Sequence, residues 1–161
     1  MADTEMIQEK IGEAIGLEKA AQKAVEDLDS RGLLKPEHMQ NLSKMKDEAS
    51  EQEQQMERLV QELTESDGFD ASTIEEKAQE TAEKASKIME TYLGEDPDTQ
   101  EALEFLCLAE GGEVTHYEVL TSVAKEVKNK KFGTRVRAIL KEEQRHLNLC
   151  TKLAKTNASE Q

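Results

Sequence analysis

Apolar residues recur every three or four positions through most of the chain, and this spacing constrains the fold more than any other feature. It places the apolar residues along one side of an α-helix. Only 3% of the residues are aromatic, while Ala, Leu, Glu, Lys and Gln, which favour helices, dominate the composition. We therefore expect an all-α protein whose 161 residues form one domain with an aliphatic core.

Glycine, proline and short polar segments divide this pattern into five predicted helices. Their expected ranges, all within a single domain 1–161, are 4–31, 36–65, 73–93, 98–129 and 134–155. Asp3 is the expected N-cap of the first helix, and Ser72 with Glu75 forms a capping box for the third. Gly111-Gly112 falls inside the fourth helix, where two glycines cost about 2 kcal/mol of helix propensity. The pair indicates a kink, a π-bulge, a close approach of another helix, or a true break.

Two Glu-x-x-His tetrads lie on the apolar side of the last two predicted helices: Glu113 with His116, and Glu143 with His146. Glu and His three residues apart project from the same side of a helix. Core positions seldom hold such groups unless they are paired or bind a metal. In the first helix Glu18 likewise stands where the apolar series requires an apolar residue. Carboxylates and imidazoles directed into a helical bundle suit iron, manganese or zinc.

The candidate metal ligands share one depth in the expected bundle. They are Glu18, Glu48, Glu51, Glu113, His116, Glu143 and His146. Each lies about 12 to 18 residues from the turn of its helical hairpin, or roughly 18–27 Å at the rise of an α-helix. Because hairpin helices are antiparallel, one layer in the middle of the bundle can hold all seven. Four carboxylates and two imidazoles in such a layer form the ligand set of dinuclear carboxylate sites.

Charge and composition narrow the partners and the compartment. The formal net charge of −14 argues against nucleic acid or an anionic membrane as a partner. The longest apolar run, around Phe105, is too short to span a bilayer. Cys107 and Cys150 match neither a disulfide framework nor a zinc motif. No secretory signal is visible at the N-terminus, so we expect a cytoplasmic protein.

At these residues the chain resembles the ferritin-like superfamily, and more closely the YciE/YciF type of bacterial stress-associated di-iron proteins. The likeness rests on the segment from Val114 to Glu118, which reads Val-Thr-His-Tyr-Glu, on the acidic pair Glu142-Glu143, and on residues 51–59. It implies an antiparallel four-helix bundle with one extra shorter helix, a dinuclear iron site held by the seven candidates above, and a homodimer. Helix 36–65 lacks the His that the ferritin-like pattern has there, which leaves a single-metal site as an alternative.

The leading functional hypothesis is a ferritin-like protein that binds two iron ions and reacts with peroxide or dioxygen in stress protection. Manganese or zinc are the other candidate metals, and a di-iron oxidase or peroxidase is the corresponding enzyme class; the residues leave open whether turnover occurs. A metal-free helical bundle that serves as an interaction or scaffold module is the alternative, since the middle of helix 36–65 is very polar. An iron-storage subunit is a third hypothesis.

Overall fold

The computed structural model describes residues 3–161, and all regular secondary structure within them is helical. The α-helices are α1 (Thr4–Ser30), α2 (Pro36–Ser66), α3 (Ala71–Leu93), α4 (Thr99–Val123) and α5 (Lys131–Ser159), with a short 3₁₀ helix, η1 (Ala124–Glu126), after α4. The prediction of an all-α protein with five α-helices is confirmed. Across the described residues, none of these helices has an apolar stretch that could traverse a lipid bilayer.

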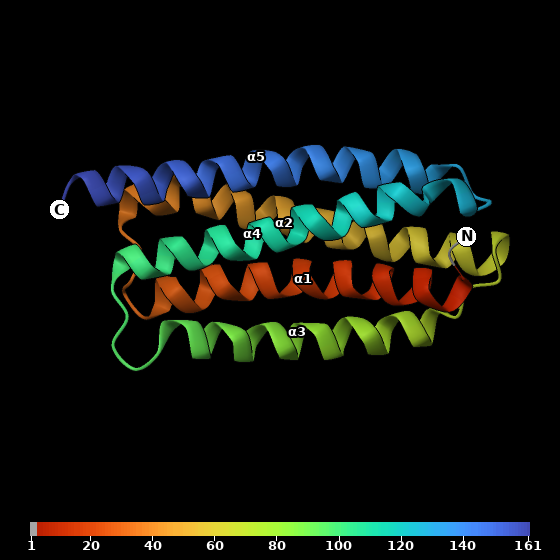
Figure 1. The fold of residues 1–161 in the computed structure, drawn as a ribbon, viewed down its shortest axis with the longest axis horizontal. Coiled ribbons are helices and arrows are strands. Elements are labelled where there is room, and N and C mark those ends of the chain that lie inside the picture. Colours follow the sequence, from red (N-terminus) through yellow and green to blue (C-terminus); the bar gives the residue numbers. More distant parts are fainter. Residues whose placement is uncertain (1–2) are drawn as a thin grey trace.

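Four long helices, α1, α2, α4 and α5, lie side by side, and the members of each contacting pair among them run antiparallel (Figure 1). The turn between α1 and α2 lies at the left end of Figure 1, and the turn between α4 and α5 lies at the right end. Between these hairpins α3 packs mainly against α1 and returns the chain to the left end. The middle parts of all four long helices therefore meet at one depth.

Each of the four long helices buries one side at alternating steps of three and four residues. In α1 the buried positions include Ile7, Ile11, Ala14, Glu18, Ala21, Val25 and Leu28. Apolar members of these stripes form two core clusters, one that includes Tyr117 and Phe132 and another that includes Leu42 and Leu106. A fully buried Leu or Phe side chain stabilises the folded state by about 1.5–3 kcal/mol. The two clusters thus hold the helices together on either side of their midpoints.

The N-terminus of α3 differs from the prediction. The helix begins at Ala71, and its N-cap is Asp70, whose carboxylate accepts hydrogen bonds from the backbone N–H groups of Ser72 at 3.0 Å and Thr73 at 3.4 Å. An N-cap side chain satisfies the first N–H groups of a helix, which have no partner inside it. Asp70 therefore performs the role that the sequence suggested for Ser72, and the helix starts earlier than expected.

The connection between α4 and α5 also differs from the prediction. The fourth helix, predicted to reach residue 129, ends at Val123, and α5 begins at Lys131. Asp67, at the end of α2, accepts hydrogen bonds from the backbone N–H groups of Lys128 at 2.7 Å and Asn129 at 3.3 Å. Because Asp67 satisfies the backbone N–H groups of Lys128 and Asn129, these residues can lie outside a helix without leaving the two donors unpaired.

The pair Gly111-Gly112 does not break α4. A Cβ atom added at either glycine would meet nothing within 4 Å. In α1, by contrast, a Cβ atom on Gly12 would lie 2.7 Å from the carbonyl oxygen of Ile74 in α3. The close approach between helices that glycine permits thus occurs at Gly12 and not in α4.

Candidate metal centre

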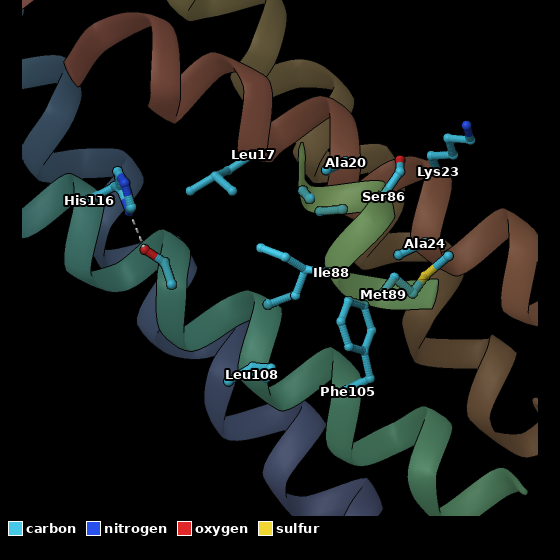
Figure 2. Close-up of a pocket in the computed structure, with 14 residues that line it drawn as sticks. Leu17, Ala20, Lys23, Ala24, Ser86, Ile88, Met89, Phe105, Leu108 and His116 are labelled. Carbon is cyan, nitrogen blue, oxygen red and sulfur yellow. Dashed lines mark hydrogen bonds between the residues drawn. The ribbon is translucent and has the colours of Figure 1, made fainter. Parts of the chain in front are cut away.

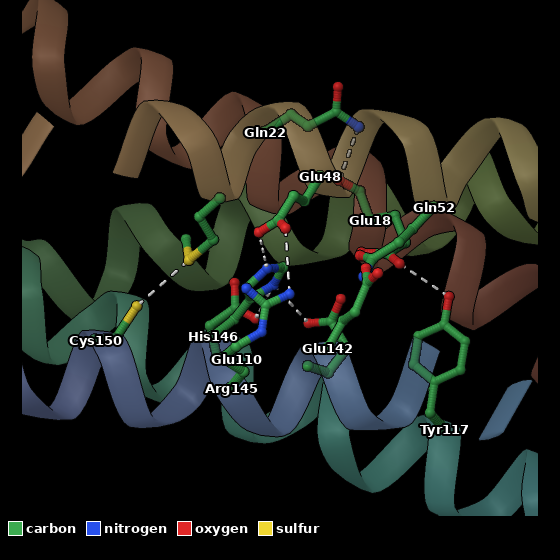
Figure 3. A network of polar contacts seen from close by, with 12 residues as sticks. Glu18, Gln22, Glu48, Gln52, Glu110, Tyr117, Glu142, Arg145, His146 and Cys150 are labelled. Carbon is green, nitrogen blue, oxygen red and sulfur yellow. Dashed lines mark hydrogen bonds and ion pairs between the residues drawn. The ribbon is translucent and has the colours of Figure 1, made fainter. Parts of the chain in front are cut away.

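A layer of buried polar side chains crosses the middle of the molecule between the two apolar clusters (Figure 3). We call it the polar layer, and its members are Glu18 of α1, Gln52 of α2, Glu110 and Glu113 of α4, and Glu143 and His146 of α5. None is more than 2% exposed. Each of these residues lies on the buried side of its helix, among mainly apolar neighbours. Packing of the apolar residues therefore buries the polar groups as well.

Within the polar layer, ligand atoms gather in two groups. Glu110, Glu143 and His146 each offer one atom, and the three atoms lie within 4.8 Å of one another. Glu18, Glu113 and Glu143 form the second group by the same measure. Glu143 belongs to both groups, as a carboxylate that bridges two cations would. Two adjacent cation sites that share Glu143 fit this geometry.

The second group carries a phenol at its edge. The hydroxyl of Tyr117 donates a hydrogen bond to Oε2 of Glu18 at 3.0 Å, and both residues are fully buried. Tyr117 lies four residues after Glu113 in α4 and belongs to one of the apolar clusters. It fixes one oxygen of Glu18, while Oε1 of the same carboxylate has no hydrogen-bond partner.

The polar layer also concentrates the unsatisfied polar atoms of the described chain. Eight buried side-chain atoms of residues 3–161 lack a hydrogen-bond partner, and all belong to the layer. They are Glu18 Oε1, Gln52 Oε1, Glu110 Oε2, both carboxylate oxygens of Glu113 and of Glu143, and His146 Nδ1. Each such atom costs about 1–3 kcal/mol when left unpaired. Bound cations would satisfy the seven atoms that come from the Glu and His side chains, and this donor set fits a metal.

Burial and mutual repulsion control the protonation of the polar layer. Burial raises the pKa of Glu18, Glu110 and Glu113 well above the ordinary 4.5, and the carboxylates beside them raise it further. Burial also opposes charge on Glu143, but hydrogen bonds and the charge of His146 outweigh it and lower its pKa. For His146 burial disfavours the imidazolium, yet the carboxylates beside it, Glu143 first, raise its pKa. Charge in the metal-free layer is therefore concentrated on the pair Glu143–His146.

These pKa shifts predict that the metal-free protein loses stability as the pH rises. Above pH 4.5, the ordinary carboxyl value, native Glu18, Glu110 and Glu113 bind more protons than in the unfolded chain, so the free energy of unfolding falls with pH. His146 acts in the same direction above 6.5, because its native pKa is raised. We expect the Tm of chelator-treated protein, followed by circular dichroism, to fall by several degrees from about pH 5 to about pH 8.

The matched variant for this experiment is Glu113→Gln, which keeps the shape of the side chain but does not titrate. Its Tm should fall less steeply over the same pH range. A Tm of the metal-free wild-type protein that rises from about pH 5 to about pH 8 would contradict the assignment.

His146 directs its two ring nitrogens toward different carboxylates. Its Nδ1 lies 3.7 Å from Glu143 and 3.9 Å from Glu110, while its Nε2 lies 2.9 Å from Oε1 of Glu48. Arg145 donates to the other oxygen of Glu48 at 3.2 Å. Although partial burial opposes it, the hydrogen bonds from His146 and Arg145 lower the pKa of Glu48. An ionised Glu48 accepts a hydrogen bond from the Nε2 N–H group, so Nδ1 is the nitrogen that would release its proton and donate its lone pair to a cation.

Glu48 is therefore placed to orient a ligand, whereas the sequence suggested that it is a ligand itself. Carboxylates that hold a metal-binding imidazole from its far side typically change metal affinity by about 10–100-fold when they are removed. We expect Glu48→Ala to weaken metal binding by a factor in this range, measured by competition with a chelating dye. Glu51→Ala, on the exposed side of the same helix, is the control and should leave the affinity unchanged.

The structure does not bring His116 into the polar layer. The side chain of His116 is 30% exposed, and its Nε2 lies 3.0 Å from Oε2 of Glu13 in α1. The reason is the phase of the stripe in α4, where the buried positions run Leu103, Leu106, Glu110, Glu113, Tyr117 and Leu120. After the three-residue step to Glu113 the next core position is four residues on, at Tyr117, so His116 faces outward. In α5 the step after Glu143 is three residues, and His146 lies inside.

Glu51 also lies outside the polar layer, since its side chain is exposed. The stripe of α2 passes through Met45, Ala49, Gln52 and Met56, so the core position falls one residue after Glu51. The amide of Gln52 occupies it and donates to Glu142 of α5. Of the seven predicted ligands, the structure brings together Glu18, Glu113, Glu143 and His146. Glu48 touches this group through His146.

Glu110 and Gln52 are members of the polar layer that were not among the predicted ligands. Both could have been found by extending the apolar stripes. Glu110 falls between Leu106 and Glu113, and Gln52 fills the gap between Ala49 and Met56. The Glu-x-x-His spacing indicated His116 as the partner of Glu113, whereas the structure has Glu110, three residues before it.

The fold and this site together define an all-helical protein with a buried carboxylate–histidine layer. Comparisons of the chain with protein-family models, with curated proteins and with solved structures gave no match. The resemblance to ferritin-like proteins therefore stays a prediction, and the function must be inferred from the geometry of the polar layer.

Proposed function

We propose that this protein is a ferritin-like dinuclear metal-binding protein whose metal is iron. The observation that carries this assignment is the position of Glu143 in both groups of ligand atoms. One cation would bind Glu110, Glu143 and Nδ1 of His146, and a second would bind Glu18, Glu113 and Glu143. The antiparallel arrangement of α1, α2, α4 and α5, with α3 as an additional helix, supports the ferritin-like assignment (Figure 1).

The charge of the polar layer agrees with two divalent ions. When ionised, Glu18, Glu110, Glu113 and Glu143 together carry four negative charges, and the imidazole of His146 is neutral when it binds a cation through Nδ1. Two divalent cations neutralise this set completely. Four ionised carboxylates at such short range are costly in the interior unless cations or protons accompany them.

The chemical nature of the ligands favours iron or manganese. Carboxylate oxygens with one imidazole nitrogen suit Fe²⁺ and Mn²⁺, while copper sites generally recruit more nitrogen or sulfur. Cys150 and Met45 lie near the layer, with their sulfur atoms 3.7 Å apart, but burial raises the pKa of the Cys150 thiol and keeps it protonated. A protonated thiol is not a good metal ligand.

The residues around the polar layer would serve a redox reaction with peroxide or dioxygen. Two ferrous ions, when bound, supply the electrons for such a reduction. Glu18, Glu110, Glu113, Glu143 and His146 hold and orient them, and the apolar clusters on both sides limit the access of water. Protection against oxidative stress is the physiological role that we infer from this chemistry, and cytoplasmic location is part of the same proposal.

Elemental analysis of the protein purified from cells supplied with iron tests this function. We expect about two iron ions per chain, with manganese as the competing metal. Fewer than about 0.2 ions per chain of iron, manganese and zinc combined, also after anaerobic addition of Fe²⁺, would refute the proposal.

Gel filtration tests the expected homodimer and separates it from a cage of 12 or 24 subunits, as an iron-storage protein would form.

One observation favours a second function, a metal-free scaffold or interaction module. The polar layer receives no carboxylate from the stripe of α2, because Gln52 occupies that position. The layer would then be held by shared protons between its carboxyl groups, as their raised pKa values permit. The effect of chelation on the Tm, treated in the Discussion, separates the two functions.

A further inference from the structure

A groove outside the polar layer lies between α1, α3 and α4 (Figure 2). Its volume is about 290 Å³, close to the lower limit of small-molecule sites in proteins. Apolar side chains form most of its wall, among them Leu17, Ile88, Met89, Phe105 and Leu108. No member of the polar layer is among the described residues that line the groove.

Packing of the helices does not explain one residue of this wall. Gly112 of α4 lines the groove, and a Cβ atom added there would meet nothing within 4 Å. Alanine at this position would favour the helix more than glycine does, and no neighbouring atom forbids it. Because Gly112 has no side chain, it leaves space in the groove. This space is the advantage that glycine offers at this position.

The rim of the groove exposes large apolar side chains. Ile88 of α3 is 50% exposed and Leu108 of α4 is 53% exposed. Tyr92, which is 43% exposed, packs its ring 5.6 Å from that of Phe105 in the groove wall. Large exposed apolar side chains gathered at one place mark a binding surface more often than a free one. An apolar ligand in the groove would remove this surface from water.

The chain is strongly acidic, but the lining of the groove is not. The protein has 35 acidic residues, yet none of them is among the described residues that line the groove. Its titratable lining residues are Lys23 and His116, and His116 is bound to Glu13. In Figure 2 Lys23 of α1 and Ser86 of α3 both lie toward the end away from His116, and the side chain of Lys23 extends outward past the rim. Within residues 3–161, neither the Lys23 ammonium nor the Ser86 hydroxyl has a hydrogen-bond or ion-pair partner.

We propose that this groove binds a single-chain anionic amphiphile, an unbranched aliphatic carboxylate. The hydrocarbon chain lies along Leu17, Ile88 and Phe105, and the carboxylate meets Lys23 and Ser86. A volume of about 290 Å³ lies at the lower limit of small-molecule sites, so the groove takes a hydrocarbon chain of modest length. Decanoate is a probe of this class. This site is independent of the metal centre.

Isothermal titration calorimetry with sodium decanoate below its micellar concentration tests the proposal on the full chain. We expect saturable binding of one decanoate per chain. Lys23→Gln should weaken it by about tenfold, because a hydrogen-bonded ion pair with the ligand is lost. Gly112→Leu, which places a side chain in the groove, should abolish it. Lys44→Gln, at an exposed lysine of α2, is the matched control and should bind decanoate as the wild type does.

A second blocking variant, Ala20→Leu on the opposite wall, keeps the test valid if Gly112→Leu fails to fold. Decanol should bind about tenfold more weakly than decanoate, since it lacks the charge that Lys23 recognises. Absence of saturable decanoate binding, or equal binding by wild type and both blocking variants, would overturn the proposal. So would self-association that both blocking variants abolish without any decanoate binding, because a second copy would then cover the groove. Metal content of these variants should equal that of the wild type, so the outcome is separate from the test of the metal centre.

Discussion

Glu143→Gln is expected to reduce the bound metal from about two ions per chain to none measurable. Glu143 is the only residue that belongs to both groups of ligand atoms found in residues 3–161, so one substitution removes a ligand from each site. The amide keeps the volume of the side chain but loses the charge and one of the two acceptor oxygens. Elemental analysis of the purified variant, and of the variant after anaerobic addition of Fe²⁺, measures the effect.

Two other variants of the polar layer and one control outside it make this result specific. Glu113→Gln removes a ligand from one group only, so the variant should retain about one ion per chain. His146→Ala should likewise affect one site, the one that includes Glu110. Glu51→Gln, on the exposed side of α2, should bind as much metal as the wild type. If Glu143→Gln and His146→Ala both retained the full metal content, the polar layer would not be the metal site.

Removal of the metal with a chelator is expected to lower the Tm by about 10 °C at neutral pH. A ligand present at about 1,000 times its dissociation constant stabilises the native state by about 4 kcal/mol, and for a chain of this length each kcal/mol corresponds to about 2–4 °C. The metal-free state also keeps the eight unpaired atoms of the layer buried. Differential scanning calorimetry with and without chelator measures the change.

The variant Glu143→Gln is the control for chelation, because a protein that binds no metal should melt at the same temperature with and without chelator. Wild-type protein whose Tm does not respond to chelation would support the metal-free scaffold function and exclude the metal centre. Lower pH should also reduce the difference between the two conditions, since metal ligands must lose their protons to bind.

The inward-facing side of α1 and α5 could be predicted from the sequence. The alternation of three- and four-residue steps is visible in α1 as Ile7, Ile11, Ala14, Glu18 and Ala21, and this periodicity is enough to assign Glu18 to the core. The same reasoning placed Glu143 and His146 correctly, because the three-residue step of α5 falls between them. Five helices and their approximate ranges followed from the same pattern with the capping residues.

Helix ends and the residues next to a stripe were less predictable. Asp67 fixes the backbone N–H groups of Lys128 and Asn129, which are far from it in sequence, so no local signal could show that α4 ends early. For His116 and Glu51 a shift of one residue around the helix decides between core and surface. Spacing within a tetrad does not contain that information, whereas the phase of the whole stripe does.

The sequence alone determined that the protein is helical, which side of α1 and α5 is buried, and that Glu18, Glu143 and His146 interrupt the apolar stripes. Only the tertiary structure decided that Glu143 is shared between two groups of ligands, that Glu48 holds Nε2 of His146, and that a groove remains between α1, α3 and α4. The physical reason is that helical periodicity depends only on residues close together in the sequence. Distances between atoms of different helices depend on how all the helices pack together.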